Sequence, residues 1–324
     1  MVLIALLLVV LLALAGIVID LGALFQERRE LRNAADAAVL AIAEDCGTGA
    51  QPCDTDTAFG TAGFYANANV EDGAAGITSL DLDLDAQSVR VVTHAVDPES
   101  GQQGVEVSFM KILGFDRMTV NAPAAAIWGH PRSGGGIPIT YELCEFEKTG
   151  LDNTVILSFH DPQDRDVEED PDCAAGPAGS DAPGAFGWLE PIEKKTCWVE
   201  LSIDSWDNGP TVGVGVGGPT FCTAQEIYDA IYRKIVMVPL YSDVRGEGSN
   251  TEYYVVGFGG FFVEMYRLGN SGDPQGPLYR MPEDFVCPDG PSEACLVGHF
   301  TEFTTNTGDT GGPDFGVTIV KLIE

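Results

Sequence analysis

The sequence predicts an α+β protein with a long N-terminal transmembrane and stalk helix, a small α+β domain, and then a β-rich domain that contains disulfides. Three observations predict it. The chain of 324 residues opens with an apolar run from Val2 to Ile19, all eight cysteines follow that run, and alternating apolar segments between Gly-, Pro- and Asp-rich loops dominate the second half. The expected boundaries are 1–45 for the helix, 46–130 for the small α+β domain, 131–137 for a linker and 138–324 for the β-rich domain.

The apolar run has no charged or strongly polar side chain between Val2 and Ile19. As an α-helix these residues measure about 27 Å, close to the hydrocarbon thickness of a bilayer. No proline precedes Pro52, and the pattern continues without a break. We therefore expect one helix from Val2 to about Ala43, with its first half in lipid and its second half outside.

The second half of this helix carries a seam of apolar residues on one face, with spacings of 7, 4, 3 and 4. Small alanines near the end of the seam allow another helix or a sheet to approach closely. The sequence predicts association through this face; its members are Leu24, Leu31, Ala35, Ala38 and Ile42.

Asp20 lies directly after the apolar run. A carboxylate at the edge of an apolar span costs free energy unless it reaches water or a partner. Two expectations stay open for Asp20. Its side chain extends to the outer headgroup level, or it pairs with a basic group on a partner helix.

The block GIVIDLGALFQERRELRNAADAAVLAIA, which starts at Gly16, resembles the N-terminal segment of the TadE/TadG-like family of Tad (Flp, tight-adherence) pilus assembly proteins. The matching features are the Asp20-x-Gly22 step, Phe25, the Arg28–Leu31 block, and most specifically the Asn33–Ala38 block. A weaker similarity to the actinobacterial TadG-like branch runs through MKILGF, VNAPAAAIWG, the CEF at Cys144 and VPLYSDVRGEGSNTEYYVVGFGGFFV. Position 5 is Ala5, where pilin-like subunits carry Glu, so processing by a prepilin peptidase is not expected.

The resemblance implies a structural role rather than catalysis. It implies a single-pass component of a Tad pilus or secretion apparatus in the cell membrane, with a cytoplasmic N-terminus and the C-terminal bulk outside. Its implied partners are the membrane and other Tad components. Arg28, Arg29 and Arg32 follow the apolar run and would by themselves favour the opposite orientation. The cysteines and the resemblance favour an extracytoplasmic bulk.

The chain is strongly acidic, with 49 acidic and 17 basic residues and a formal net charge of −32. Such a surface repels nucleic acid, so we expect no nucleic-acid partner.

The cysteines predict a disulfide framework, because an even number follows the apolar run. Cys46 with Cys53, and Cys287 with Cys295, enclose short loops and form the simplest local pairs. Three connectivities remain open for the other four, Cys144, Cys173, Cys197 and Cys222. No CxxC occurs and the histidines lack metal spacing, which argues against a zinc site.

In the small domain, Asp54 or Thr55 is placed to cap a helix whose buried face is Ala58, Ala62, Tyr65 and Ala66. Leu80, Leu82 and Leu84 alternate with aspartates and predict a strand, and Val89–Val96 predicts a second. GVEVSFMKILGF favours a short helix that Gly114 ends, and VNAPAAAIW a final strand.

In the β-rich region, the sequence pattern predicts one helix and several strands. The capping-box pattern at Thr223–Glu226 starts a helix to about Lys234, with Ile227, Ala230, Ile231 and Ile235 on one face. The expected strands are Ile139–Leu143, Thr154–Phe159, Thr196–Ile203, Ile235–Tyr241, Tyr253–Tyr266, Cys295–Phe303 and Val317–Ile323.

Catalytic motifs of hydrolases, zincins, P-loop proteins and dinucleotide-binding proteins are absent, so no enzyme activity, cofactor or small-molecule substrate is expected. Carboxylates are the remaining candidates for site chemistry. The aspartates of the strand at 81, 83 and 85 favour a solvated face over a Ca²⁺ site. The weak Ca²⁺ candidates are Asp164, Asp166, Glu168 and Asp170, in a loop without EF-hand spacing. The alternative function is a membrane-tethered acidic adhesin or Ca²⁺-binding module unrelated to pili.

Overall fold

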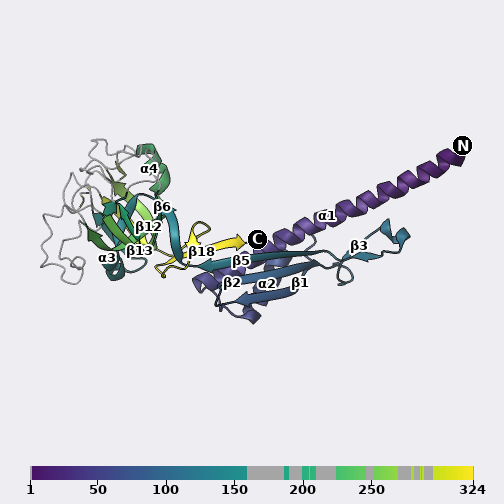
Figure 1. Ribbon diagram of the computed structural model, residues 1–324, viewed down its shortest axis with the longest axis horizontal. Coiled ribbons are helices and arrows are strands. Elements are labelled where there is room, and N and C mark those ends of the chain that lie inside the picture. Colours follow the sequence, from purple (N-terminus) through teal and green to yellow (C-terminus); the bar gives the residue numbers. More distant parts are fainter. Residues whose placement is uncertain are drawn as a thin grey trace. The chain divides into compact units, whose positions relative to one another are not determined.

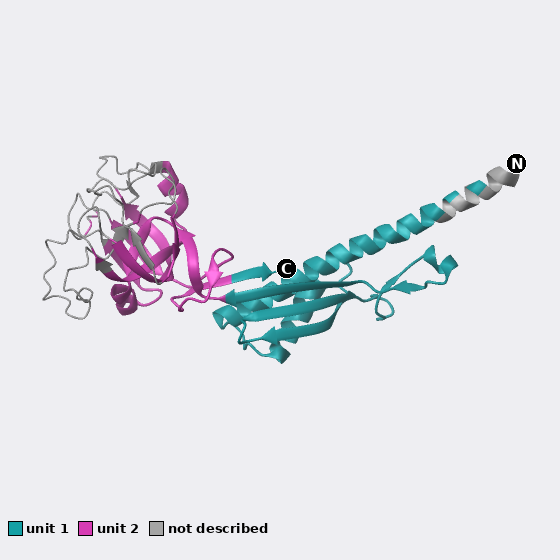
Figure 2. Ribbon diagram, in the orientation of Figure 1, with its two compact units in different colours: residues 1–128, 320–324 teal, residues 129–319 magenta. Residues whose placement is uncertain are grey.

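The computed structural model describes residues 2–158, 186–189, 199–203, 205–208, 224–245, 252–268, 279–280, 285, 287 and 295–323. The chain divides into two compact units (Figure 2). Unit 1 contains residues 1–128 and 320–324, and unit 2 contains residues 129–319. The described part has the expected α+β character, with a long N-terminal helix followed by a β-rich region with disulfides.

Unit 1 is built on an antiparallel arrangement of three strands in the order β1-β2-β5, with β18 next to β5. Its elements are α1 (Val2–Thr48), α2 (Thr55–Ala68), β1 (Ala75–Asp83), β2 (Ser88–Ala95), β3 (Val105–Glu106), the 3₁₀ helix η1 (Met110–Leu113), β4 (Arg117–Met118), β5 (Asn121–Gly129) and the end of β18 (Val317–Ile323).

Helix α1 is a single continuous helix, as the sequence predicts (Figure 1). The C-terminal part of α1 packs with α2 against the sheet. Alanines at the contact allow the two helices to approach closely, because a methyl group is the only side chain between the backbones. The main core of unit 1 comprises Ala38, Val39, Ile42 and Ala43 of α1, Ala58 and Ala62 of α2, Val89 and Val91 of β2, and Ala126, Trp128 and Val320.

A buried hydroxyl also joins α1 to the sheet. Thr93 of β2 is fully buried, and its Oγ1 donates a hydrogen bond of 2.9 Å to the carbonyl oxygen of Leu31. A buried hydroxyl without a partner would cost free energy, so this bond favours one position of α1 on the sheet.

Most local predictions for unit 1 are confirmed, but Tyr65, expected on the buried face of α2, and Leu84, expected on the apolar face of the strand, are exposed. Asp54 caps α2 by accepting a hydrogen bond of 2.9 Å from the backbone N–H of Thr57. Leu80 and Leu82 are partly buried, whereas Asp81 and Asp83 are exposed. The helix expected before Gly114 is one 3₁₀ turn, and Gly114 ends it at φ 89°. That left-handed conformation favours glycine.

Unit 2 is β-rich. Its elements are β6 (Pro131–Gly136), β7 (Ile139–Glu142), α3 (Leu143–Thr149), β8 (Thr154–Ser158), β9 (Phe186–Trp188), β10 (Val199–Ser202), β11 (Ser205–Asn208), α4 (Ala224–Ile231), β12 (Ile235–Arg245), β13 (Glu252–Arg267), β14 (Tyr279–Arg280), β15 (Cys295–Phe300), β16 (Phe303–Thr305), β17 (Asp309–Thr310) and the start of β18. Its main sheet has the order β8-β15-β13-β12-β7-β9, with β11 and β14 also pairing with β13. A smaller sheet has the order β10-β6-β17, and β16 runs parallel to β18.

The core of unit 2 is aromatic. The rings of Phe146, Phe261 and Tyr141 surround the buried Phe300, with ring centroids 4.7, 4.9 and 5.3 Å from it. Edge and tilted contacts at these distances add attraction beyond the area that the rings bury.

Three expectations for this region are wrong. Residues 131–136 of the expected linker form β6, because Gly134 and Gly136 let this strand lie against Met237; a Cβ at Gly136 would stand 2.2 Å from the carbonyl oxygen of Met237. The strand expected to include Leu143 stops at Glu142, and the short helix α3 follows it. Ile235 begins β12 and is exposed rather than part of the buried face of α4.

A search of the described residues finds no helix with the length and apolar composition needed to cross a membrane. The side chains at 1–6, 8–10, 12 and 13 lie outside the described part.

Candidate functional site

The candidate site lies in unit 1, where an excursion of the chain between β2 and β5 contacts α1. We call residues 97–120 the arm. The arm contains β3, η1 and β4, and its two short strands pair antiparallel, Val105 opposite Met118 and Glu106 opposite Arg117. Figure 1 shows β3 beside α1, beyond the end of the sheet.

Asp20 binds the arm through three successive backbone amides. Its Oδ1 accepts a hydrogen bond of 3.1 Å from Ser108, and its Oδ2 accepts bonds of 2.8 Å from Phe109 and 2.7 Å from Met110. These N–H groups lie at the start of η1, so the carboxylate acts as a cap supplied from a distant segment. The structure thus gives Asp20 a partner that neither expectation named, the backbone of a distant segment of its own chain.

The environment of Asp20 favours its charged form. Only 5 % of Asp20 is exposed. Burial acts to raise the pKa of this carboxyl, but the three backbone N–H donors outweigh burial and hold the pKa below its usual value. The site is therefore a carboxylate held by aligned amide dipoles.

Gly16 lies one helical turn before Asp20, and Phe109 covers it. A Cβ at Gly16 would stand 2.4 Å from the Phe109 ring, which no side chain can accommodate without moving the ring. Gly16 and Asp20 therefore lie on one face of α1, where the Phe109 ring packs on Gly16 and three backbone amides of the arm donate to Asp20. We call this place on α1 the notch.

The base of the arm is closed by Asp97 and Arg117. The guanidinium of Arg117 lies 2.5 Å from the Asp97 carboxylate and donates a bond of 2.9 Å to the carbonyl oxygen of Gly104. Asp97 also accepts a bond of 2.8 Å from the backbone N–H of Ser100. The hydrogen bond from the Ser100 backbone and then the one from Arg117 lower the pKa of Asp97 to about 2.

The tip of the arm, Phe109–Phe115, presents apolar side chains to solvent. Ile112 is 81 % exposed, Leu113 60 % and Phe115 49 %. The one charged residue of the tip, Lys111, forms an ion pair with Glu106 of β3. Exposed apolar side chains grouped on a short loop are typical of a contact surface.

A second apolar surface follows α1. Its described members recur at spacings of 4, 3, 4, 3 and 4, which keeps them on one face of the helix. We call this set the stripe: Leu7, Leu11, Leu14, Val18, Leu21 and Phe25, all exposed. The stripe lies on a different face from Gly16 and Asp20, since the helix turns about 100° per residue.

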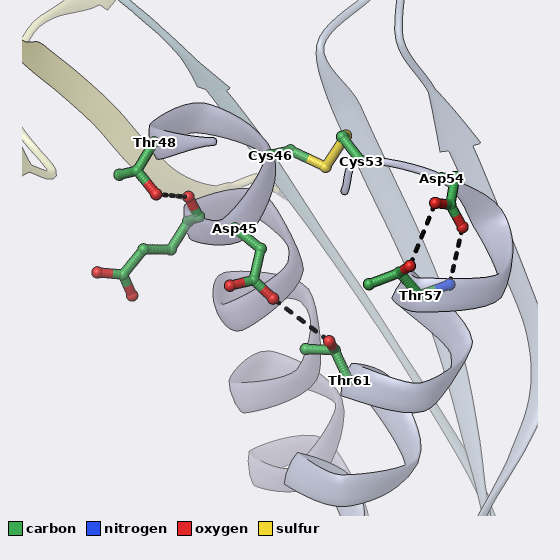
Figure 3. Close-up of a disulfide and its surroundings, with 8 residues drawn as sticks. Asp45, Cys46, Thr48, Cys53, Asp54, Thr57 and Thr61 are labelled. Atoms are coloured by element: carbon green, nitrogen blue, oxygen red, sulfur yellow. Dashed lines mark hydrogen bonds between the residues drawn. A yellow bond between two sulfur atoms is a disulfide. The ribbon is translucent and has the colours of Figure 1, made fainter. Parts of the chain in front are cut away.

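A disulfide joins the end of α1 to the start of α2. Figure 3 shows Cys46 bonded to Cys53, with Asp54 capping α2 and Thr61 donating a bond of 3.3 Å to Asp45. Closing so short a loop in the unfolded chain stabilises the fold by about 2 kcal/mol.

The second expected local pair, Cys287 with Cys295, is also present. Cys144 is disulfide-bonded as well, and its three candidate partners, Cys173, Cys197 and Cys222, lie outside the described residues.

The seam residues expected to associate with a partner lie in the core of this chain. Leu24 is partly buried, and the other four are nearly or fully buried: Leu31, Ala35, Ala38 and Ile42. Helix α2 and the sheet of unit 1 cover them. The seam therefore has an intramolecular partner.

The Ca²⁺ candidates Asp164, Asp166, Glu168 and Asp170 lie outside the described residues. Among the residues that are described, no group of three or more His, Cys, Asp or Glu side chains is placed to hold a metal ion. Asp81 of the acidic strand face stands opposite Arg90 on β2.

Comparison with known families identifies the N-terminal segment. Residues 1–44 match the model of a family described as putative Flp pilus-assembly TadE/G-like. This match confirms the resemblance drawn from the Asn33–Ala38 block, but not its assignment to the actinobacterial branch. No curated protein and no solved structure matches the chain.

The TadE/G-like segment coincides with α1 and contains Gly16, Asp20 and the whole stripe. The arm lies beyond the matched residues. Sequence reasoning missed the arm as the partner of Asp20, although two signals were available: a carboxylate at the end of an apolar run, and an apolar FMKILGF segment in an acidic chain.

Proposed function

We propose that this protein is a membrane-anchored, non-enzymatic component of a Tad (Flp-type) pilus or secretion apparatus. The observation that carries the proposal is the TadE/G-like match over residues 1–44, which coincides with helix α1. The family is described as an assembly family, which supports a role through protein contacts rather than catalysis.

The anchor in this proposal is the segment Val2–Ile19, which is apolar and long enough for the hydrocarbon core of a bilayer. The N-terminus lies in the cytoplasm, and unit 2 lies outside together with the part of unit 1 that follows the anchor. The disulfides Cys46–Cys53 and Cys287–Cys295 support this orientation, because disulfides persist in oxidising compartments.

Contacts with other Tad components use the stripe rather than the seam. The seam is covered within the chain, whereas the stripe exposes large apolar side chains at the heptad spacing that helix pairs use. In a bilayer such a face associates with another helix by close packing.

Site-specific photo-crosslinking tests this proposal. Val18 lies on the stripe and is 66 % exposed, whereas its neighbour Ile19 is 62 % exposed and lies about 100° away around the helix. A photo-reactive amino acid is placed at either position in cells that express the Tad genes. We expect crosslinks to another Tad component from position 18 and mainly lipid adducts from position 19.

The difference in protein crosslinking between positions 18 and 19 shows whether the stripe is the contact face. Both side chains are similarly exposed on the same turn, so folding and membrane insertion are matched. Equal protein crosslinking from both positions would contradict a role for the stripe. Protein crosslinks from neither position would contradict membership of a Tad assembly.

A further inference from the structure

The tip of the arm is held at one level of α1 by two independent contacts. Asp20 accepts hydrogen bonds from three amides at the start of the tip, and the Phe109 ring packs on Gly16. Gly16 and Asp20 are separated by about 6 Å along the helix axis. The tip therefore lies beside the last turn of the apolar run Val2–Ile19.

The tip differs in charge from the rest of the chain. The segment Phe109–Phe115 contains one lysine and no acidic residue, whereas the whole chain carries a formal charge of −32. Its large side chains are exposed although an apolar core lies nearby in the same unit. Ile112, at 81 %, is the extreme case. This composition suits a bilayer interface, where an apolar face is buried about 5–10 Å into the boundary between headgroups and acyl chains.

We propose that the arm tip, Phe109–Phe115, inserts into the lipid interface of the leaflet from which α1 emerges. The proposal rests on the proposed function, since it takes Val2–Ile19 as the membrane anchor. The chain then has a second point of contact with the bilayer, and unit 1 is held at a defined distance from it. Lipid is the occupant that fits, because the tip is bound to the last turn of the segment that lies in lipid.

The remaining features of the arm agree with this placement. Lys111 carries a long aliphatic stem, so its ammonium group, with its partner Glu106, can lie at the level of the headgroups while Ile112 and Leu113 face the acyl chains. The three amides at Asp20 satisfy a carboxylate at the hydrocarbon edge that would otherwise be costly. The aspartate and the tip thus stabilise each other at the interface.

Spin labelling of the full chain in phosphatidylcholine nanodiscs tests the inference. Cysteine replaces Ile112 at the tip, Leu14 in the anchor or Phe64 on α2, which is 70 % exposed. The five described cysteines, Cys46, Cys53, Cys144, Cys287 and Cys295, are disulfide-bonded and do not compete for label, and label taken up by the unaltered chain is subtracted. Label accessibility is measured with oxygen, which enters lipid, and with a polar nickel chelate, which does not.

We expect the label at Leu14 to be deep in lipid, the label at Ile112 at interfacial depth, and the label at Phe64 in water. Nickel accessibility at Ile112 as high as at Phe64, with Leu14 still deep, would overturn the role of the tip and leave the anchor intact. Exclusion of both reagents from Ile112 would indicate a protein contact and would also overturn it. A label at Leu14 in water would overturn the proposed function and, with it, this inference.

A second variant excludes misfolding as the cause of a negative result. Ile112→Ser and Leu113→Ser replace exposed side chains and leave the core unchanged. In this double variant, a label at Phe115→Cys should move toward water relative to the same label in the parent chain. An unchanged depth would overturn the proposal.

Discussion

At the scale of single residues, Asp20 shows how one carboxylate can fix a distant loop. Burying a charged carboxylate in lipid costs free energy unless the carboxylate has a partner. Here the charge is compensated by three backbone N–H groups from residues that lie 88 to 90 positions later in the chain. Hydrogen bonds to a charged acceptor are stronger than those between neutral groups, so the contact is specific as well as attractive.

Replacing Asp20 by Ala should release the arm from α1. The amides of Ser108, Phe109 and Met110 lose their acceptor, and we expect faster hydrogen exchange in the peptide that contains them, with α2 unchanged. Asp20→Asn is the matched control. It keeps a carbonyl acceptor but loses the charge, so its exchange should lie between that of the parent and that of the Ala variant. Equal protection in all three proteins would show that the hydrogen bonds do not hold the arm.

At the scale of elements, helix α1 uses its faces for different purposes. The face with Leu31 and Ala38 forms the core of unit 1, and the notch at Gly16 and Asp20 receives the arm. The stripe is left exposed. The arm in turn depends on its base, where Arg117 joins Asp97 to the carbonyl oxygen of Gly104.

The base of the arm should loosen in acid. The pKa of Asp97 in the folded protein is about 2, against 3.8 for an ordinary aspartate. The unfolded chain therefore binds a proton first as the pH falls. The contribution of Asp97 is fully present above about pH 4 and is lost toward pH 2. We expect pepsin cleavage at the arm tip to rise over that range.

The titration of the Asp97 carboxyl carbon, followed by NMR, checks the cause. Its midpoint should lie near 2 in the parent chain and move toward 3.8 in an Arg117→Gln variant. Ser100 still donates to the carboxylate in that variant, so the pKa of Asp97 stays below that of an ordinary aspartate. A midpoint near 3.8 in the unaltered protein would contradict the assigned hydrogen bonds.

At the scale of the whole molecule, the chain forms two compact units that each carry a disulfide, and an apolar run opens the first of them. The proposed arrangement puts all of the chain after the anchor Val2–Ile19 on the outer side of the membrane. The acidic excess then faces an aqueous compartment, where like charges favour solubility. The arginines at 28, 29 and 32 also lie on the outer side in this arrangement.

Protease applied to intact cells checks this topology. We expect proteinase K to digest the chain after the anchor, together with a tag fused to the C-terminus, while a cytoplasmic marker protein stays intact. Bacteria with an outer membrane are first converted to spheroplasts so that the protease reaches the units. Digestion only after the membrane is permeabilised would place the units in the cytoplasm and contradict the proposal.

The sequence by itself determined what depends on neighbouring residues. The continuity of α1, the Asp54 cap, the alternation of Leu80 and Leu82, and the disulfide of Cys46 with Cys53 each involve residues within one element or one short loop. Periodicity, capping and loop closure act over that range.

The tertiary structure alone decided which partners the faces of α1 have. The seam of Leu31 and Ala38 was recognised as a contact face, but a pattern of small residues does not state whether its partner belongs to the same chain. Asp20 was recognised as an anomaly, but its partner depends on how β2 and β5 place the arm. Such contacts follow from the path of the chain in space, because hydrogen bonds and packing act over distances in space and not along the sequence.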